Sequence, residues 1–174
     1  MPIRNINVRS RPGNRAEGLL NVERVVFRCA LGKAGVSAFK REGDGATPLG
    51  RLRLLGGYTR NERHPLRRSG LVLIPIRADL GWCDAPADAN YNRPVRLPFR
   101  ASHEKMLRGD RLYDVCIVLD WNIRPRRRNG GSAIFMHLAR PGFRPTEGCV
   151  AVERRVMLRL LPYLSRKTVL TVLA

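Results

Sequence analysis

Residues 132–152, SAIFMHLARPGFRPTEGCVAV, contain the pattern that decides the fold and the chemistry of this chain. Residues 132–138 are a short apolar run, which predicts a buried strand that ends at His137. Two prolines and a glycine follow, and they predict an irregular loop because both residue types interrupt regular structure. Such a loop can fold the chain back on the strand and bring Cys149 close to His137.

A cysteine and a histidine in this arrangement are typical of a thiol nucleophile and its base. The thiolate attacks carbonyl carbon, and a nearby imidazole can take the thiol proton and return it to a leaving amine. Gly148 permits a backbone conformation closed to other residues, so the amides of Gly148 and Cys149 are expected to form an oxyanion hole. A lone buried cysteine is usually an inert hydrophobe. We expect that inert role for the other three, Cys29, Cys83 and Cys116.

Five ordered blocks of sequence resemble the L,D-transpeptidases of the YkuD type, cysteine enzymes that act on bacterial peptidoglycan stem peptides. The likeness spans about residues 18–165. The blocks are KREGDGATPLG at 40–50, GWCD at 81–84 with YNR at 91–93, LYD at 112–114 with DWN at 120–122, GSAIFMH at 131–137 and PTEGC at 145–149.

Three positions depart from the pattern of better-studied members. Those members usually carry Ser/Thr-His-Gly-Cys with Arg or Asn two residues later, whereas this chain has Thr146-Glu147-Gly148-Cys149 and Ala151. Leu138 stands where Gly or Ser often follows the histidine, and the resemblance implies that its backbone carbonyl orients the imidazole. The departures predict that local contacts with the substrate differ.

The resemblance implies a set of site residues, with no cofactor and no metal. The catalytic group would be Cys149, His137, Gly148 and Leu138. The expected substrate-binding residues are Arg140, Arg144, Thr146, Trp82, Tyr91, Asn92 and Arg93. A core-filling role for Trp82 and a turn-stabilising role for residues 91–93 are equally compatible with the sequence. Residues 102–105, SHEK, lack the paired histidines of a metalloprotease helix, and we expect His64 and His103 to be exposed.

Composition predicts one soluble globular domain over residues 1–174. The chain is 44% hydrophobic and 27% charged, and it has no apolar stretch of roughly 18 residues that could span a membrane. Its net charge of +19 raises the alternative of nucleic-acid binding, and residues 124–128 are rich in arginine. The arginines are scattered, however, and no nucleic-acid motif accompanies them. Peptidoglycan stem peptides or muropeptides carry carboxylates that arginine can bind, so specific nucleic-acid binding is not expected.

The start of the chain and its cysteines predict a cytoplasmic location. Residues 1–5 lack the apolar core of a secretory signal, and the four cysteines have no paired spacing. A periplasmic location is the alternative if the sequence has been trimmed. Inside the cell, water would resolve the acyl-enzyme, as in an L,D-carboxypeptidase of muropeptide recycling. The alternatives are a transpeptidase that forms 3,3 cross-links and a non-catalytic peptidoglycan- or nucleic-acid-binding module.

Hydrophobic periodicity predicts a mainly β fold, a β-sandwich or barrel-like sheet of the YkuD kind with one or two short helices. One amphipathic helix is expected over residues 153–164, with its last turn weakened by Pro162, and a shorter one over 102–108. The predicted strands are residues 3–8, 22–31, 52–55, 71–76, 112–120, 133–138 and 168–173.

Overall fold

The protein is mainly β, as the sequence predicts, with 42% of its residues in strands and 8% in helices. The fold is taken from a computed structural model that describes residues 1–60 and 69–174. His64, expected to be exposed, lies outside the described residues.

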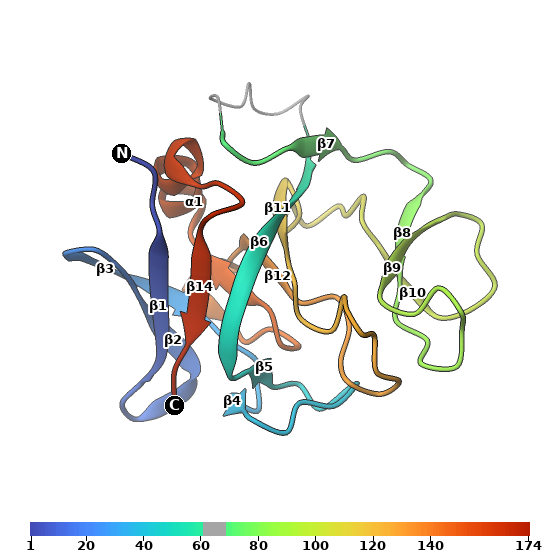
Figure 1. Cartoon of the computed structure of the whole chain (residues 1–174), viewed down its shortest axis with the longest axis horizontal. Helices are drawn as coiled ribbons and strands as arrows, with labels where there is room; N and C mark the ends of the chain where they lie inside the picture. The colour runs from blue at the N-terminus through green and yellow to red at the C-terminus, as the bar shows by residue number, and fades with distance from the viewer. Residues whose placement is uncertain (61–68) are drawn as a thin grey trace.

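The described strands form one large sheet that closes into a barrel (Figure 1). Closure comes from the long strand β6, which pairs with β14 through its first half and with β11 through its second. A short strand, β7 (Leu73–Pro75), adds to β6 in parallel. The barrel strands, in the order in which they pair, are β11 (Val115–Leu119), β12 (Phe135–Leu138), β13 (Val150–Val152), β3 (Val25–Ala30), β2 (Asn14–Val22), β1 (Asn5–Arg11), β14 (Val169–Val172) and β6 (Gly50–Thr59).

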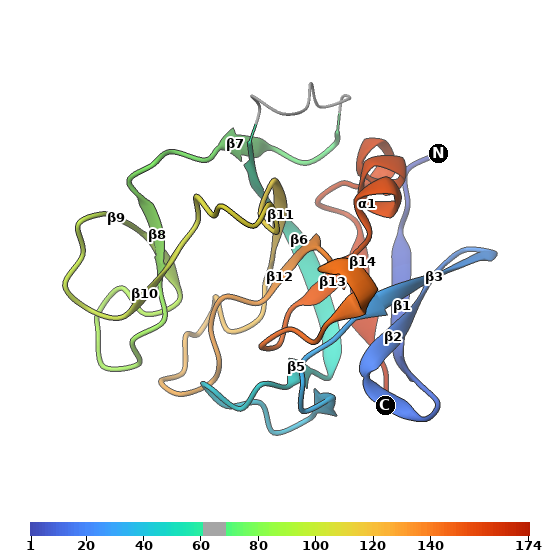
Figure 2. The same cartoon turned by 180° about the vertical axis from the view of Figure 1, so that it is seen from behind.

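A second, three-stranded sheet lies beside the barrel, on the side away from β1 and β3 (Figures 1 and 2). It consists of β8 (Leu80–Cys83) between β9 (Arg93–Arg96) and β10 (His103–Lys105), all antiparallel. A two-stranded pair, β4 (Val36–Ser37) and β5 (Thr47–Pro48), belongs to the loop region before β6. The helix expected over residues 102–108 is wrong, because the backbone there pairs with β8 as a strand.

The predicted amphipathic helix is confirmed as α1 (Arg154–Leu160), which continues as a 3-10 turn over Leu161–Tyr163. The tighter turn contains Pro162, as expected for a residue that lacks an amide donor. A further 3-10 turn covers Pro141–Phe143. The apolar face of the helix packs into the barrel core through Val156, Met157, Leu160, Leu161 and Leu164.

Both faces of β12 and β13 are buried, and they face different surroundings. Met136, Leu138, Val150 and Val152 point into the barrel core. Phe135 and Cys149 instead belong to a second apolar cluster that includes Trp82 of the small sheet. Because side chains alternate along a strand, residues 135, 137, 149 and 151 share the outer face. The small sheet covers that face, which explains why residues 132–138 have a continuous apolar sequence.

The sequence predicted the long apolar strands and missed the short or polar ones. The run predicted over 22–31 begins at the turn of a hairpin, whose first strand, β2, is rich in polar residues. The short strands β8, β9, β10 and β13 were not predicted, because three or four residues carry too little periodicity.

Candidate active site

A cavity of about 550 Å³ lies between the outer face of the barrel, the small sheet and two loops. His137 and Cys149 both line it. The other lining residues that the argument below uses are Lys40, Asp84, His103, Glu104, Lys105, Arg108, Tyr113, Arg140, Arg144, Thr146, Glu147 and Ala151.

Strand register brings His137 and Cys149 together. Strands β12 and β13 run parallel, and His137 is the partner of Ala151. Cys149 comes two residues before Ala151, so it lies on the same face and diagonally across from His137. The small methyl group of Ala151 is the side chain directly opposite the imidazole, at the position where the better-studied family members carry Arg or Asn.

The Cys149 sulfur is held by two backbone groups and is largely shielded from solvent. Phe135 N–H donates to Sγ at 3.3 Å, and the thiol donates to the carbonyl of Ala133 at 3.2 Å. The residue is 8% exposed. Burial, together with a smaller contribution from the nearby charge of Glu104, raises the pKa of the Cys149 thiol to about 12. The resting group is therefore a neutral thiol.

The His137 imidazole is fixed in one tautomer. Its Nδ1 lies 2.8 Å from the carbonyl oxygen of Leu138, which can only accept, so Nδ1 carries the proton and Nε2 is left as an acceptor. This is the contact that the resemblance implies for the residue after the histidine. The ring also packs edge-on against Tyr113, with centroids 5.2 Å apart. Burial lowers the pKa of His137 to about 4, so the imidazole is neutral at neutral pH.

The turn before Cys149 differs from the expected oxyanion hole. Gly148 N–H donates to the hydroxyl of Thr146 at 3.1 Å, and that hydroxyl donates to the Cys149 carbonyl at 2.7 Å. The Gly148 amide is thus already hydrogen-bonded. The expectation that the amides of Gly148 and Cys149 are both free to hold an oxyanion is therefore wrong for Gly148. Thr146 serves this turn in addition to lining the cavity.

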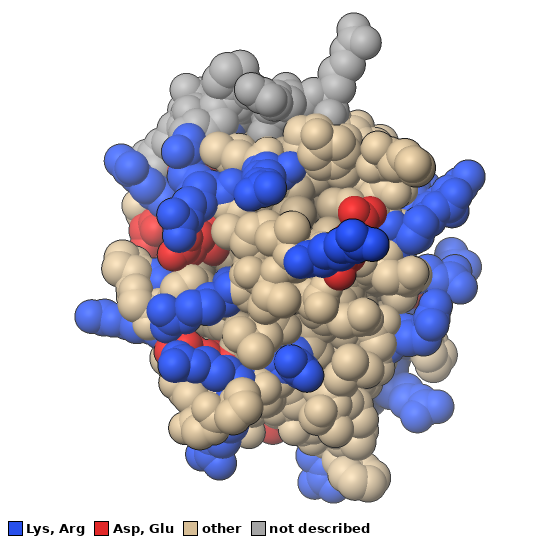
Figure 3. Space-filling model, turned by 90° about the vertical axis from the view of Figure 1, so that its left-hand side faces the viewer, with Lys and Arg blue, Asp and Glu red and all other residues tan. Residues whose placement is uncertain are grey.

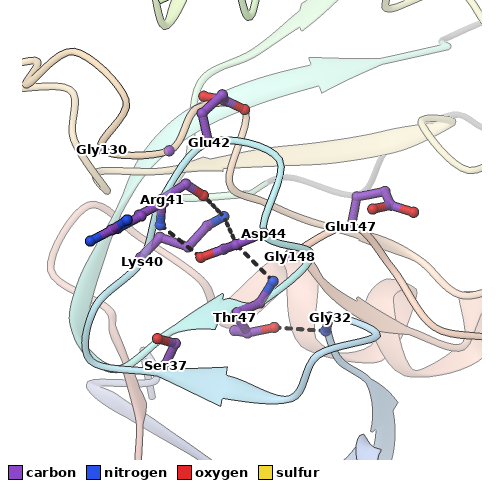
Figure 4. A network of polar contacts seen from close by, with 12 residues as sticks. Gly32, Ser37, Lys40, Arg41, Glu42, Asp44, Thr47, Gly130, Glu147 and Gly148 are labelled. Carbon is purple, nitrogen blue, oxygen red and sulfur yellow. Dashed lines mark hydrogen bonds and ion pairs between the residues drawn. The ribbon is translucent and has the colours of Figure 1, made fainter.

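The loop that precedes β6 packs against this turn (Figure 4). Gly148 has φ +139°, and a side chain there would meet the Ala46 carbonyl at 2.7 Å, so only glycine fits. Thr47 accepts a hydrogen bond from the Gly32 amide at 2.8 Å, and Lys40 forms an ion pair with Asp44. The side chain of Lys40 is 3% exposed and reaches the cavity wall. The 40–50 block therefore positions the turn before Cys149 through packing.

The substrate-binding residues predicted from the sequence divide into two groups. Arg140, Arg144 and Thr146 line the cavity, as the loop between base and nucleophile requires. Trp82, Tyr91, Asn92 and Arg93 are not among the lining residues, and substrate contact at these four positions stays a prediction.

Packing and hydrogen bonds account for these four. Trp82 is 4% exposed, packs edge-on against Phe135 and donates to Asn92 Oδ1 at 3.0 Å. The Asn92 side chain also donates to the carbonyls of Trp121 and Asn122. Tyr91 is buried and donates to Glu42, whereas Arg93 lies exposed on β9. The contacts of Trp82, Tyr91 and Asn92 join the small sheet and the segment beside it to the barrel and its loops.

Sequence reasoning missed the polar residues that the small sheet brings to the cavity. Glu104, on β10, accepts a 2.6 Å hydrogen bond from the Tyr113 hydroxyl and faces the nucleophile. His103, which was expected to be exposed, is half-buried and also lines the cavity. The one sequence feature that pointed to this part of the cavity was the LYD block at 112–114, which contains Tyr113. Nothing in the sequence places residues 103–105 opposite Cys149.

Positive charge is distributed widely over the molecule. On the face shown in Figure 3, lysine and arginine side chains form separate groups with uncharged surface between them. Arg140 and Arg144 are the exposed arginines of the base-to-nucleophile loop. Within residues 1–60 and 69–174, no group of three His, Cys, Asp or Glu side chains is placed to hold a metal ion. None of the helices in this part of the chain has the length and apolar character needed to cross a membrane.

The fold and this site define a cysteine-dependent L,D-transpeptidase domain. A family model described as the L,D-transpeptidase catalytic domain, YkuD, matches residues 16–172. Because the match covers nearly the whole chain, the protein belongs to this family, whose members act on the peptide stems of peptidoglycan. No curated protein and no solved structure matches the chain.

Proposed function

We propose that Cys149 is the nucleophile and His137 the base of an acyl transfer at the L,D bond of peptidoglycan tetrapeptide stems. One observation carries the proposal: the two side chains line the same cavity, His137 from β12 and Cys149 from the position just before the adjacent strand β13, and the imidazole is held by Leu138 with Nε2 available. A thiol and an acceptor nitrogen in one cavity are the parts that this chemistry requires.

The first half-reaction forms a thioester. As Sγ attacks the carbonyl carbon of the third stem residue, diaminopimelate, its proton passes to Nε2 of His137. The resting pair is neutral, so this proton transfer accompanies the attack. The tetrahedral intermediate then collapses, the carbon–nitrogen bond to D-alanine breaks, and the imidazolium returns the proton to the leaving amine. Of the two amides predicted to hold the oxyanion, that of Gly148 is bonded to Thr146. The Cys149 amide is therefore the donor that we propose for the oxyanion.

The second half-reaction releases the acyl group, and we propose that water is its usual acceptor. His137 takes a proton from the attacking water, the carbon–sulfur bond breaks, and the thiol regains its proton as a tripeptide stem leaves. Support comes from the four free cysteines, which fit a reducing compartment such as the cytoplasm, where recycled muropeptides are the available stems. An amine acceptor on the same thioester would instead give a 3,3 cross-link.

The test is incubation with a disaccharide-tetrapeptide, with and without an added amine acceptor, followed by mass measurement of the products. Loss of one alanine in both reactions is expected for an L,D-carboxypeptidase. A joined product in the presence of the amine would identify a transpeptidase and contradict the choice of water. Absence of any product, with intact fold, would contradict the enzymatic proposal and favour a binding module. Cys149→Ala is the matched inactive control.

A further inference from the structure

The small sheet presents two carboxylates to the nucleophile. Glu104 on β10 pairs with Trp82 on β8, so the two side chains share a face, and Asp84 lies two residues further on the same face. Trp82 packs on Phe135, and this shows that the shared face looks toward the barrel. Glu104 and Asp84 both line the cavity that contains Cys149.

The protein compensates these two negative charges only in part. Arg108 forms a two-point ion pair with Asp110 at 2.9 and 2.7 Å, and its remaining contact with Glu104 is longer, at 3.4 Å. Tyr113 and Arg108 both donate to Oε1 of Glu104, as expected for an ionised carboxyl group. Oδ1 of Asp84 is buried without a hydrogen-bond partner, although a buried carboxylate oxygen without a donor is costly.

This incomplete compensation acts against the nucleophile. The charge of Glu104 adds to the effect of burial in raising the pKa of Cys149, and burial, with a smaller contribution from the charge of Asp84, raises the pKa of Glu104. A cation placed beside Glu104 would oppose both effects, because an opposite charge favours the ionised carboxylate and weakens its influence on the thiol. The cavity is also lined by Arg140, whose guanidinium lies 3.9 Å from the Asp110 carboxylate, and by the exposed Arg144.

We propose that Glu104, with Asp84 behind it, binds a primary ammonium group of the acyl-donor substrate in the cavity that contains Cys149. The inference rests on the proposed function and extends it. It makes Glu104 a specificity-determining residue, because a substrate that lacks the cation leaves the unfavourable charge beside the thiol.

Several other charged or titratable groups face this end of the cavity. His103 and Lys105 flank Glu104 on β10, while Arg108, Asp110 and Tyr113 approach from the following segment. Lys40 reaches the cavity from the loop before β6 and lowers the pKa of Cys149. Glu104 is the group to vary, because its carboxylate both lines the cavity and acts on the thiol.

The test compares three tetrapeptide stems with wild type and Glu104→Gln. Their third residues are diaminopimelate, lysine and N-acetyl-lysine, so that the last lacks the cation. Wild type should prefer the lysine stem over the acetylated one by about tenfold or more in kcat/KM, the typical effect of one charge-assisted hydrogen bond. In Glu104→Gln that ratio should fall close to one. The exposed Glu23→Gln is the control and should keep the wild-type ratio.

A second measurement needs no substrate. The rate of Cys149 alkylation by iodoacetamide, followed from pH 6 to pH 10, reports the thiolate fraction. In Glu104→Gln the rise with pH should begin at lower pH than in wild type, and Glu23→Gln should follow wild type. Thermal unfolding of both variants checks that the fold is intact.

The outcomes separate this inference from the proposed function. Equal turnover of the lysine and acetylated stems by wild type would overturn the ammonium subsite and leave the acyl transfer standing. An unchanged alkylation profile in Glu104→Gln would overturn the link to the thiol. If no stem acylates Cys149 in any variant, the proposed function itself fails.

Discussion

The two walls of the cavity are built in different ways. The barrel wall holds His137 on β12 and Cys149 immediately before the adjacent strand β13, and backbone groups satisfy both side chains. The small-sheet wall holds Glu104 and Asp84, whose charges are incompletely compensated within the protein. The difference indicates a division of labour: the barrel wall suits chemistry, while the small-sheet wall holds carboxylates that neighbouring cations compensate only in part and so suits recognition.

The strongest test of the role assigned to the barrel wall is removal of the proposed nucleophile. Cys149→Ala should abolish product formation, because no other cysteine lines the cavity among the described residues. The fold should survive with a loss of about 1 kcal/mol, since the Phe135 amide loses its sulfur acceptor. Mass spectrometry of the stem products and thermal unfolding are the two measurements. Retained turnover would contradict the assignment of Cys149.

Removing the base should have the next largest effect. His137→Gln is expected to lower kcat by about 10²- to 10⁴-fold, the usual contribution of general acid–base catalysis. Steady-state kinetics on the tetrapeptide stem measure it. His103→Gln is the comparison on the small-sheet wall, and a loss as large as that of His137→Gln would contradict the division between the walls.

The buried imidazole also predicts a pH dependence of stability. The pKa of His137 is lowered from 6.5 to about 4 in the folded protein, so between these values the unfolded chain takes up a proton that the folded one does not. The free energy of unfolding should therefore fall as pH decreases from 6.5 to 4, by an amount on the order of 3 kcal/mol. Urea titrations across this range test it, and in His137→Gln this part of the slope should disappear.

A substitution in the turn before Cys149 should have a smaller effect, on stability. Gly148→Ala should destabilise the fold by about 1–3 kcal/mol, because the backbone is left-handed and the new methyl group meets the Ala46 carbonyl. Gly142→Ala is a matched control in the same loop: its φ is +72°, but its added carbon meets nothing within 4 Å. Thermal unfolding should rank the two variants in that order, and equal losses would show that the contact with Ala46 is unimportant.

The smallest expected effect is on substrate binding by the loop between His137 and Cys149. Arg144→Ala should raise KM by about tenfold or less with little change in kcat, since an exposed arginine contributes to binding a substrate carboxylate without aiding the chemistry. Arg93→Ala should leave both constants unchanged, because Arg93 lies outside the cavity lining. A larger effect at Arg93 would restore the role that the sequence predicted for it.

The sequence by itself determined the barrel wall. Residues 132–138 and the loop to Cys149 are contiguous, so periodicity, prolines and glycines predicted the strand and the loop, and the resemblance to the family added the pairing of His137 with Cys149. The core-facing face of the helix over 153–164 was predictable for the same reason, because its apolar spacing is local. The chain's inert cysteines were also expected to be buried, and Cys29, Cys83 and Cys116 are.

Which side chains lie across the cavity from Cys149 depends on the tertiary structure alone. Strand β10 is three residues long and carries no periodic signal, and its position depends on pairing with β8 and on Trp82 packing against Phe135. The engagement of the Gly148 amide by Thr146 is likewise a matter of loop geometry. Local patterns report secondary structure, whereas the contact of Glu104 with the cavity arises from two sheets packing together, which no short stretch of sequence encodes.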